Sequence, residues 1–264
     1  MSLIYTPTGK AREYSPLALN VYRGGCDHQC RYCYCPSIMR GAWSATPRPR
    51  DLSGLAREAA RASRQILMCF VGDPYCAADV RAENTRSALV ALRLARCSVA
   101  ILSKGGMRCL RDLDLFRDWP GGRVKVGATL TFLTESLSRE WEPGAAATLE
   151  RLEALHQLRK AGIKTWASIE PVIDPVESLA VIDASLPYCD AYKVGRWNHD
   201  AQANAIDWPA FGKAAVDMIR AAGRRLYVKA DLRPHFPAGY LRPEECDMDA
   251  LTLPDRPSER TFFA

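Results

Sequence analysis

Short β-rich apolar runs alternate with helical patterns along most of this 264-residue chain. Such alternation predicts βα units around a parallel sheet, because each crossover helix returns the chain to the same edge of the sheet. Ser53 is placed to cap the first helix and Gly162 to end the fourth. We expect strands at residues 17–22, 66–71, 99–102, 124–130, 165–169, 191–194 and 226–229, and helices at residues 53–65, 84–96, 107–117, 145–161, 176–186 and 207–223.

These six helices and about seven strands are fewer than the eight pairs of a closed barrel. The sequence therefore predicts an α/β fold, a partial (β/α)6 TIM-like barrel, over residues 1–230. Residues 231–264 contain Pro234, Pro237, Pro243, Pro254 and Pro257. We expect this proline-rich segment to be an irregular extension packed on the barrel.

The composition, 48% apolar and 25% charged residues, is that of a chain with one sizeable core and excludes fibrous and disordered proteins. A net charge of +6 is compatible with a nucleic-acid partner without requiring one. The longest apolar run, residues 66–71, is far too short to cross a bilayer, and the first twenty residues carry no export signal. We therefore predict a cytoplasmic protein whose ten cysteines are reduced and serve metal or redox chemistry.

Three of these cysteines, Cys26, Cys30 and Cys33, form a C-x3-C-x2-C pattern directly after the first predicted strand. The carboxyl ends of barrel strands carry the catalytic loops, so the pattern lies where chemistry is expected. Thiolates suit an iron–sulfur cluster, and three of them on a four-iron cube leave one iron without a protein ligand. The alternative is a zinc site that uses Cys35 as the fourth thiolate.

This cysteine pattern resembles that of the radical S-adenosylmethionine (SAM) superfamily. The resemblance implies a [4Fe-4S] cluster whose open iron binds the amino and carboxylate groups of SAM. It also implies reductive cleavage of SAM to a 5′-deoxyadenosyl radical that abstracts hydrogen from a substrate. An electron donor such as flavodoxin or ferredoxin would be a partner of such an enzyme.

Further motifs resemble the spore photoproduct lyase branch of the superfamily, and they imply a set of SAM contacts. Tyr32 would contact the adenine, Gly72 and Asp73 would hold the ammonium group, and Lys104, after Ser103 at the end of the third strand, would hold the carboxylate. Either Thr129 or Thr131 could bond the ribose hydroxyls. Arg151, which follows Glu142-Pro143-Gly144, could clamp a carboxylate.

The same resemblance bears on the substrate. Cys76 would return a hydrogen atom to the substrate radical, and Tyr34 would take part in that relay. It implies a nucleobase in DNA or RNA as substrate, in a lyase-like repair or modification reaction, with basic residues such as Arg48 and Arg50 near the phosphates. Two alternatives remain open: the same chemistry on a peptide or small metabolite, and a non-catalytic iron–sulfur or zinc-binding module.

Overall fold

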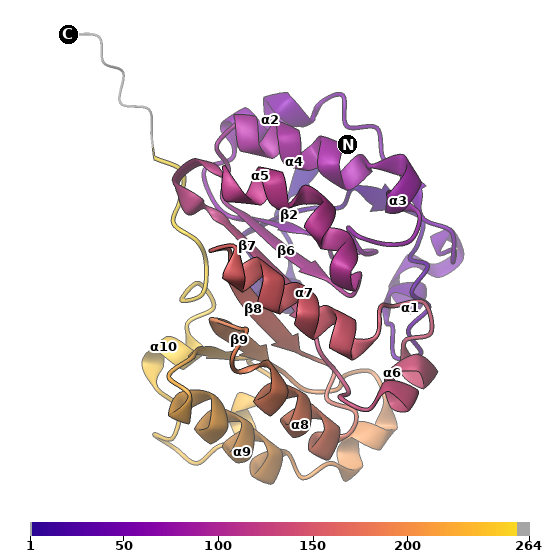
Figure 1. The fold of residues 1–264 in the computed structure, drawn as a ribbon. Coiled ribbons are helices and arrows are strands. Elements are labelled where there is room, and N and C mark those ends of the chain that lie inside the picture. The colour runs from indigo at the N-terminus through magenta and orange to yellow at the C-terminus, as the bar shows by residue number, and fades with distance from the viewer. Residues whose placement is uncertain (1, 258–264) are drawn as a thin grey trace, which may run out of the picture.

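The computed structural model describes residues 2–257, which form one α/β unit (Figure 1). Its main sheet has eight strands in the order β1-β2-β5-β6-β7-β8-β9-β10, and within the described residues its two ends do not pair with each other. Only β1 runs antiparallel to its neighbour β2. The predicted partial barrel is confirmed. The strands are β1 (Ile4–Tyr5), β2 (Leu17–Leu19), β5 (Ile66–Met68), β6 (Val99–Ser103), β7 (Val124–Thr129), β8 (Lys164–Ile169), β9 (Ala191–Val194) and β10 (Arg225–Val228).

The crossover helices cover the outer face of this sheet, the side nearer the viewer in Figure 1. They are α2 (Leu55–Arg61), α4 (Asn84–Leu94), α5 (Leu113–Arg117), α7 (Thr148–Lys160), α8 (Pro175–Ser185) and α9 (Trp208–Ala221). Shorter helices lie in the connections: α1 (Cys35–Met39), α3 (Asp79–Ala82), α6 (Glu135–Trp141) and α10 (Pro243–Cys246). No helix within residues 2–257 has the length and apolar character needed to span a membrane.

Local signals explain several helix ends. The Asp207 carboxylate accepts a 3.0 Å hydrogen bond from the Ala210 amide and so caps α9. Gly162 ends α7 as expected: its φ of 80° lies in the left-handed region, and its amide donates to the Arg159 carbonyl. Ser53 does not cap α2, because its amide and hydroxyl donate to the Asp51 carboxylate instead.

The predicted first two strands are too long, and Asn20 supplies the reason. Its Oδ1 accepts hydrogen bonds from the Phe70 and Val71 amides at 2.8 and 3.0 Å. Because these two amides bond to a side chain rather than to a neighbouring strand, β5 ends at Met68 and the chain continues into the loops of the barrel mouth. The predicted helix at 107–117 is also different: residues Gly106–Asp112 form a 3-10 helix, and only Leu113–Arg117 are α-helical.

A tryptophan fills the interior of the barrel. The buried Trp166 ring lies directly over Gly127, where a Cβ atom would stand 2.5 Å from its Nε1. That Nε1 donates to the Ile101 carbonyl at 3.0 Å. Trp166 therefore packs across the barrel interior, in one cluster with Leu67 and Ala100.

The chain after β10 returns along the sheet to the opposite end of the barrel. The Lys125 ammonium donates to the Leu251 carbonyl, and the Leu253 amide donates to Gln65 Oε1 at 2.9 Å. Leu251 and Leu253 are both buried. Leu251 and Leu253 are thus packed at that end of the barrel, and residues 258–264 of the proline-rich segment lie outside the described residues.

Candidate cofactor site at the barrel mouth

The cysteine loop is held from two sides. It follows β3 (Tyr22–Arg23), which pairs with β4 (Arg48–Pro49) in a small second sheet. A Cβ on Gly25 would lie 1.5 Å from the Ser44 carbonyl oxygen, and one on Gly144 would lie 2.1 Å from that of Asp27. Both positions need glycine because two backbones approach too closely for any side chain. The Gly144 amide also donates to the His28 carbonyl at 2.9 Å.

The three predicted ligand thiols, Cys26, Cys30 and Cys33, are partly buried on this loop. Burial raises the pKa of Cys26 and raises that of Cys30 to about 11, whereas a hydrogen bond with Cys35 lowers the pKa of Cys33 to about 6. Cys35 is buried, with its Sγ 3.9 Å from the Phe70 carbonyl. Across residues 2–257, no three His, Cys, Asp or Glu side chains converge as ligands of a single metal ion. A cube places a different iron on each thiolate, so three thiols spread along one partly buried loop fit it.

The ends of β5 and β6 meet this loop through Gly72 and Asp73. Gly72 has a φ of 92°, and a Cβ there would lie 3.0 Å from the Gly25 carbonyl oxygen. Asp73 Oδ1 accepts from Ser103 Oγ at 2.6 Å, and Oδ2 accepts from the Lys104 amide at 2.7 Å. Asp73 therefore ties the two strand ends together at the edge of the cysteine loop.

Lys104 presents a cation to the cysteine loop. Its Nζ lies 5.5 Å from the centre of the Tyr32 ring, and among residues 2–257 it forms no hydrogen bond or ion pair. Burial lowers the pKa of Lys104, but Cys30 and Glu142 raise it, and the balance lies above the ordinary value. The ammonium is thus charged and available to an anionic group.

Glu142 joins several of the predicted residues. Its Oε1 accepts from the Tyr32 hydroxyl and from Thr131 Oγ1, the latter at 3.3 Å. Its Oε2 lies 2.5 Å from Arg151 Nη2. Arg151 is fully buried and donates its remaining bonds to the carbonyls of Ala146 and Thr129. The carboxylate that Arg151 clamps is therefore that of Glu142.

From the sequence, Glu142 is expected only as part of the Glu142-Pro143-Gly144 motif, with no role of its own. The signal that could have found it was the charge pair itself, an acid before Pro-Gly and an arginine nine positions later on an apolar helix face. Such a pair is expected to be buried together, because an unpaired buried charge is costly.

The two residues predicted for hydrogen return have different surroundings. Tyr34 is 42% exposed, and its ring centre lies 5.9 Å from that of His199. Cys76 is fully buried, and burial raises its thiol pKa to about 12. It lines a pocket of about 250 Å³ on the outer side of the β5 and β6 loops, together with Tyr75, Asp79, Val80, Met107, Arg108 and Arg111.

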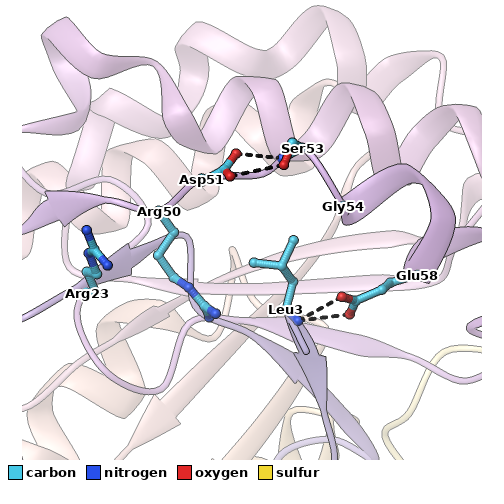
Figure 2. Close-up of a pocket in the computed structure, with 7 residues that line it drawn as sticks. All are labelled: Leu3, Arg23, Arg50, Asp51, Ser53, Gly54 and Glu58. Carbon is cyan, nitrogen blue, oxygen red and sulfur yellow. Dashed lines mark hydrogen bonds between the residues drawn. The ribbon is translucent and has the colours of Figure 1, made fainter. Parts of the chain in front are cut away.

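A second pocket, of about 340 Å³, lies beside β1 (Figure 2). Arg23 and Arg50 line it, but so do two carboxylates that the chain itself satisfies: Asp51 accepts from Ser53, and Glu58 accepts from the Leu3 amide. None of the predicted cofactor or cluster residues lines this pocket.

The chain is similar to several known proteins. The model of the radical SAM superfamily matches residues 21–185. An uncharacterized protein of Methanocaldococcus jannaschii is 29% identical over 174 residues, which are 64% of this chain and 65% of that protein, slightly less than two thirds of its length.

Two solved structures share the fold at low sequence identity. Streptococcus suis SuiB bound to S-adenosylmethionine is 13% identical with a TM-score of 0.63, covering 85% of this chain and 53% of SuiB. Spore photoproduct lyase complexed with dinucleoside spore photoproduct is 13% identical with a TM-score of 0.63, covering 88% of this chain and 80% of the lyase. At this identity the likeness establishes the fold.

The predicted superfamily is confirmed by the family match, which covers the cysteine loop, the strand ends at Asp73 and Lys104, and the Glu142–Arg151 pair. Since residues 21–185 make up more than half of the chain, this protein belongs to the radical SAM superfamily of enzymes.

Proposed function

We propose that this protein binds a [4Fe-4S] cluster and SAM at the barrel mouth and abstracts hydrogen from a nucleobase in DNA or RNA. The observation that carries the cofactor part is the Lys104 ammonium, which is unpaired among the described residues and lies beside a loop with three thiols. Bound together, the two cofactors would supply a 5′-deoxyadenosyl radical once an electron donor such as flavodoxin or ferredoxin reduces the cluster.

Different residues of the chain would bind the cluster and the two charged groups of SAM. Cys26, Cys30 and Cys33 would hold the cluster, and Lys104 would hold the SAM carboxylate through charge-assisted hydrogen bonds. Asp73 already accepts three hydrogen bonds from the chain, yet a carboxylate has about four acceptor positions. It would therefore still have capacity for the SAM ammonium group.

The remaining predicted contacts follow from the same network. Tyr32, held by Glu142, would be fixed against the adenine. Thr129 and Thr131 lie at the end of β7, but Thr131 Oγ1 is engaged by Glu142. We therefore assign the ribose contact to Thr129.

Several observations support the nucleobase. The fold resembles that of spore photoproduct lyase, which was solved with a dinucleoside spore photoproduct. Arg23 and Arg48 are exposed on the two-stranded β3–β4 sheet that flanks the cysteine loop, where phosphates could be bound. Tyr34 is exposed beside His199 and could stack on a base.

A peptide substrate is the second candidate. It is favoured by the likeness to SuiB, which was also solved bound to the precursor peptide SuiA and whose TM-score there is 0.58.

Two measurements test the proposal. Anaerobically reconstituted protein should contain iron and sulfide in equal amounts and should release 5′-deoxyadenosine from SAM when reduced. Binding of single-stranded DNA should weaken steeply as salt rises, because phosphate contacts release counterions. A loaded cluster without 5′-deoxyadenosine would instead indicate a non-catalytic module, and absent or salt-independent DNA binding would favour the peptide.

A further inference from the structure

A second polar group lies at the mouth, on strands that carry none of the predicted cofactor residues. Glu170 follows β8, Gly195 follows β9 and Lys229 follows β10, as shown by the hydrogen bonds from the Gly195 and Lys229 amides to Ile169 and Val194. A Cβ on Gly195 would lie 2.8 Å from Lys229 Cδ and 3.0 Å from Glu170 Cδ. The two long side chains therefore lie over Gly195 and meet there.

These side chains form an ion pair that is almost excluded from water. Lys229 Nζ lies 2.5 Å from Glu170 Oε2, and the side chains are 3% and 15% exposed. The Tyr14 hydroxyl donates to the same oxygen at 2.6 Å, and the Lys229 ammonium lies 4.7 Å from the centre of the Tyr14 ring. Burial and the charge of Glu170 raise the pKa of Tyr14 well above its usual value, so this hydroxyl stays a donor.

Such a pair is weak evidence of a purely structural role. Burying two charges costs about as much as their attraction returns, and apolar replacements are often as stable. The barrel holds other buried lysines, Lys125 and Lys193, whose Nζ atoms donate to backbone carbonyls and so tie segments together. Lys229 instead holds a side chain that faces the mouth.

The two oxygens of Glu170 are engaged unequally. Oε2 accepts from both Tyr14 and Lys229. Within the described residues, Oε1 has only one long contact, 3.4 Å from Asn198 Nδ2, although a carboxylate oxygen can accept two hydrogen bonds. Oε1 is therefore an oriented acceptor with free capacity.

Glu170 also lies near the cysteine loop. Asn198 Nδ2 lies 3.4 Å from Glu170 Oε1, and the ring centre of the next residue, His199, lies 5.9 Å from that of Tyr34, the residue that follows Cys33. Asp73 and Lys104, by contrast, follow β5 and β6 in another part of the sheet. The mouth therefore has a cofactor flank and, away from it along the sheet, a flank that includes the Glu170 acceptor.

We propose that Glu170 is the specificity residue of this mouth and that its Oε1 accepts a hydrogen bond from a ring N–H of the substrate base. This inference rests on the nucleobase of the proposed function. Lys229 and Tyr14 position the carboxylate by occupying Oε2, so that only Oε1 meets the substrate. The acceptor selects bases that carry a ring N–H over bases in which that hydrogen is replaced.

The test measures binding of fluorescein-labelled single-stranded oligonucleotides to the anaerobically reconstituted protein with SAM present. Each oligonucleotide carries one central thymine or hypoxanthine, either unmodified or methylated at the ring nitrogen that bears the hydrogen. We expect methylation of at least one of these bases to weaken binding to the wild type about tenfold, because a charge-assisted hydrogen bond is replaced by a clash. This comparison needs no change in the protein.

The matching variant is Glu170→Gln. The donors of Tyr14 and Lys229 would fix the glutamine oxygen at the Oε2 position and so place its NH2 group where Oε1 now lies. We expect the unmodified base to lose about tenfold in affinity and methylation to have no further effect. Glu153→Gln, a half-exposed carboxylate on α7, serves as the control and should bind like the wild type.

The outcomes separate this inference from the function it rests on. If the wild type binds oligonucleotides but methylation and Glu170→Gln change nothing, the assignment of Glu170 is overturned while the nucleobase stands. If the wild type binds no oligonucleotide, the nucleobase is overturned and this inference with it. A melting temperature for Glu170→Gln equal to that of the wild type shows that lost affinity is not lost folding.

Discussion

Arg151 Nη2 lies 2.5 Å from Glu142 Oε2, and both side chains are completely buried. Around this pair are the Tyr32 hydroxyl from the cysteine loop, the carbonyl of Thr129 at the end of β7 and the carbonyl of Ala146 just before α7. The pair is therefore the point at which the cysteine loop, the end of β7 and the start of α7 are joined.

Removing one partner of this pair should destabilise the fold. Arg151→Met leaves the Glu142 charge buried without its cation, which costs about 3–5 kcal/mol in comparable pairs. We expect urea denaturation of the cluster-free protein to show a loss of that size in the free energy of unfolding. The double variant Arg151→Met/Glu142→Gln should regain part of the loss, and a single variant within about 1 kcal/mol of the wild type would contradict the burial of this charge.

Lys104 is predicted to contribute affinity for SAM. Replacing it with methionine keeps the aliphatic stem but removes the cation, so SAM binding to the reconstituted protein should weaken about 10- to 100-fold. Lys104→Arg should lose less, and iron content should be unchanged in both. Lys160→Met, at the end of α7, is the matched control. Calorimetric titration with SAM measures the effect, and equal affinity of Lys104→Met and wild type would remove Lys104 from the site.

Variants of Cys30 and Cys35 should distinguish a four-iron cube from a zinc site that uses Cys35 as its fourth thiolate. If Cys26, Cys30 and Cys33 hold a cube, Cys30→Ala should lose nearly all iron and sulfide, whereas Cys35→Ala should keep both. A four-thiolate zinc site would lose its metal in either variant. Iron, sulfide and zinc analysis of the reconstituted proteins decides between them, and zinc in the wild type with none in Cys35→Ala would overturn the cluster.

Cys76 should affect the fate of the substrate rather than the cleavage of SAM. Its thiol is buried and, because burial raises its pKa to about 12, it stays protonated and can give up a hydrogen atom. We expect Cys76→Ala to keep its cluster and its rate of 5′-deoxyadenosine formation while the substrate product changes. The loss in stability should stay below about 2 kcal/mol, because only one small buried atom is removed. An unchanged product would exclude Cys76 from the reaction.

The lowered pKa of Lys193 predicts that the free energy of unfolding depends on pH. Burial, and then the charge of Lys229, lower its pKa from 10.5 to about 7. Between pH 7 and 10.5 the unfolded chain therefore binds more protons at this residue than the folded protein, so stability should rise with pH across that window. Lys193→Met should lack this rise, giving a difference on the order of 2 kcal/mol between pH 7 and 9.5. Parallel urea titrations of the two proteins measure it, and identical slopes against pH would contradict the prediction.

Much of the fold followed from local patterns. The strands at β6, β7, β8 and β9 and the helices at α4, α7, α8 and α9 lie within a few residues of their predicted bounds, because hydrophobic periodicity is a property of neighbouring residues. The predicted bounds that were wrong depend on tertiary contacts. Asn20 takes the amides that would have lengthened β5 from fifty positions away in the chain, a partner that no local window contains.

The candidate site divides in the same way. The spacing of Cys26, Cys30 and Cys33 lies within eight consecutive residues, and the role predicted for Lys104 comes from the resemblance to the spore photoproduct lyase branch. By contrast, Glu170 carries nothing in its immediate neighbourhood that marks it, and Glu142 is marked only by the Pro-Gly that follows it and by an arginine nine positions later. Their importance arises from partners on other elements of the fold, such as Tyr14, which is 156 positions from Glu170.

The sequence by itself determined the kind of protein this is: a βα barrel with three cysteines at the end of its first strand. Its apolar periods and thiol spacing act over a few residues, so they can be recognised without the fold. Only the tertiary structure decided which charges meet. An unpaired charge is costly to bury, and this cost depends on residues that are distant in the sequence. The fold therefore pairs Arg151 with Glu142 and Lys229 with Glu170.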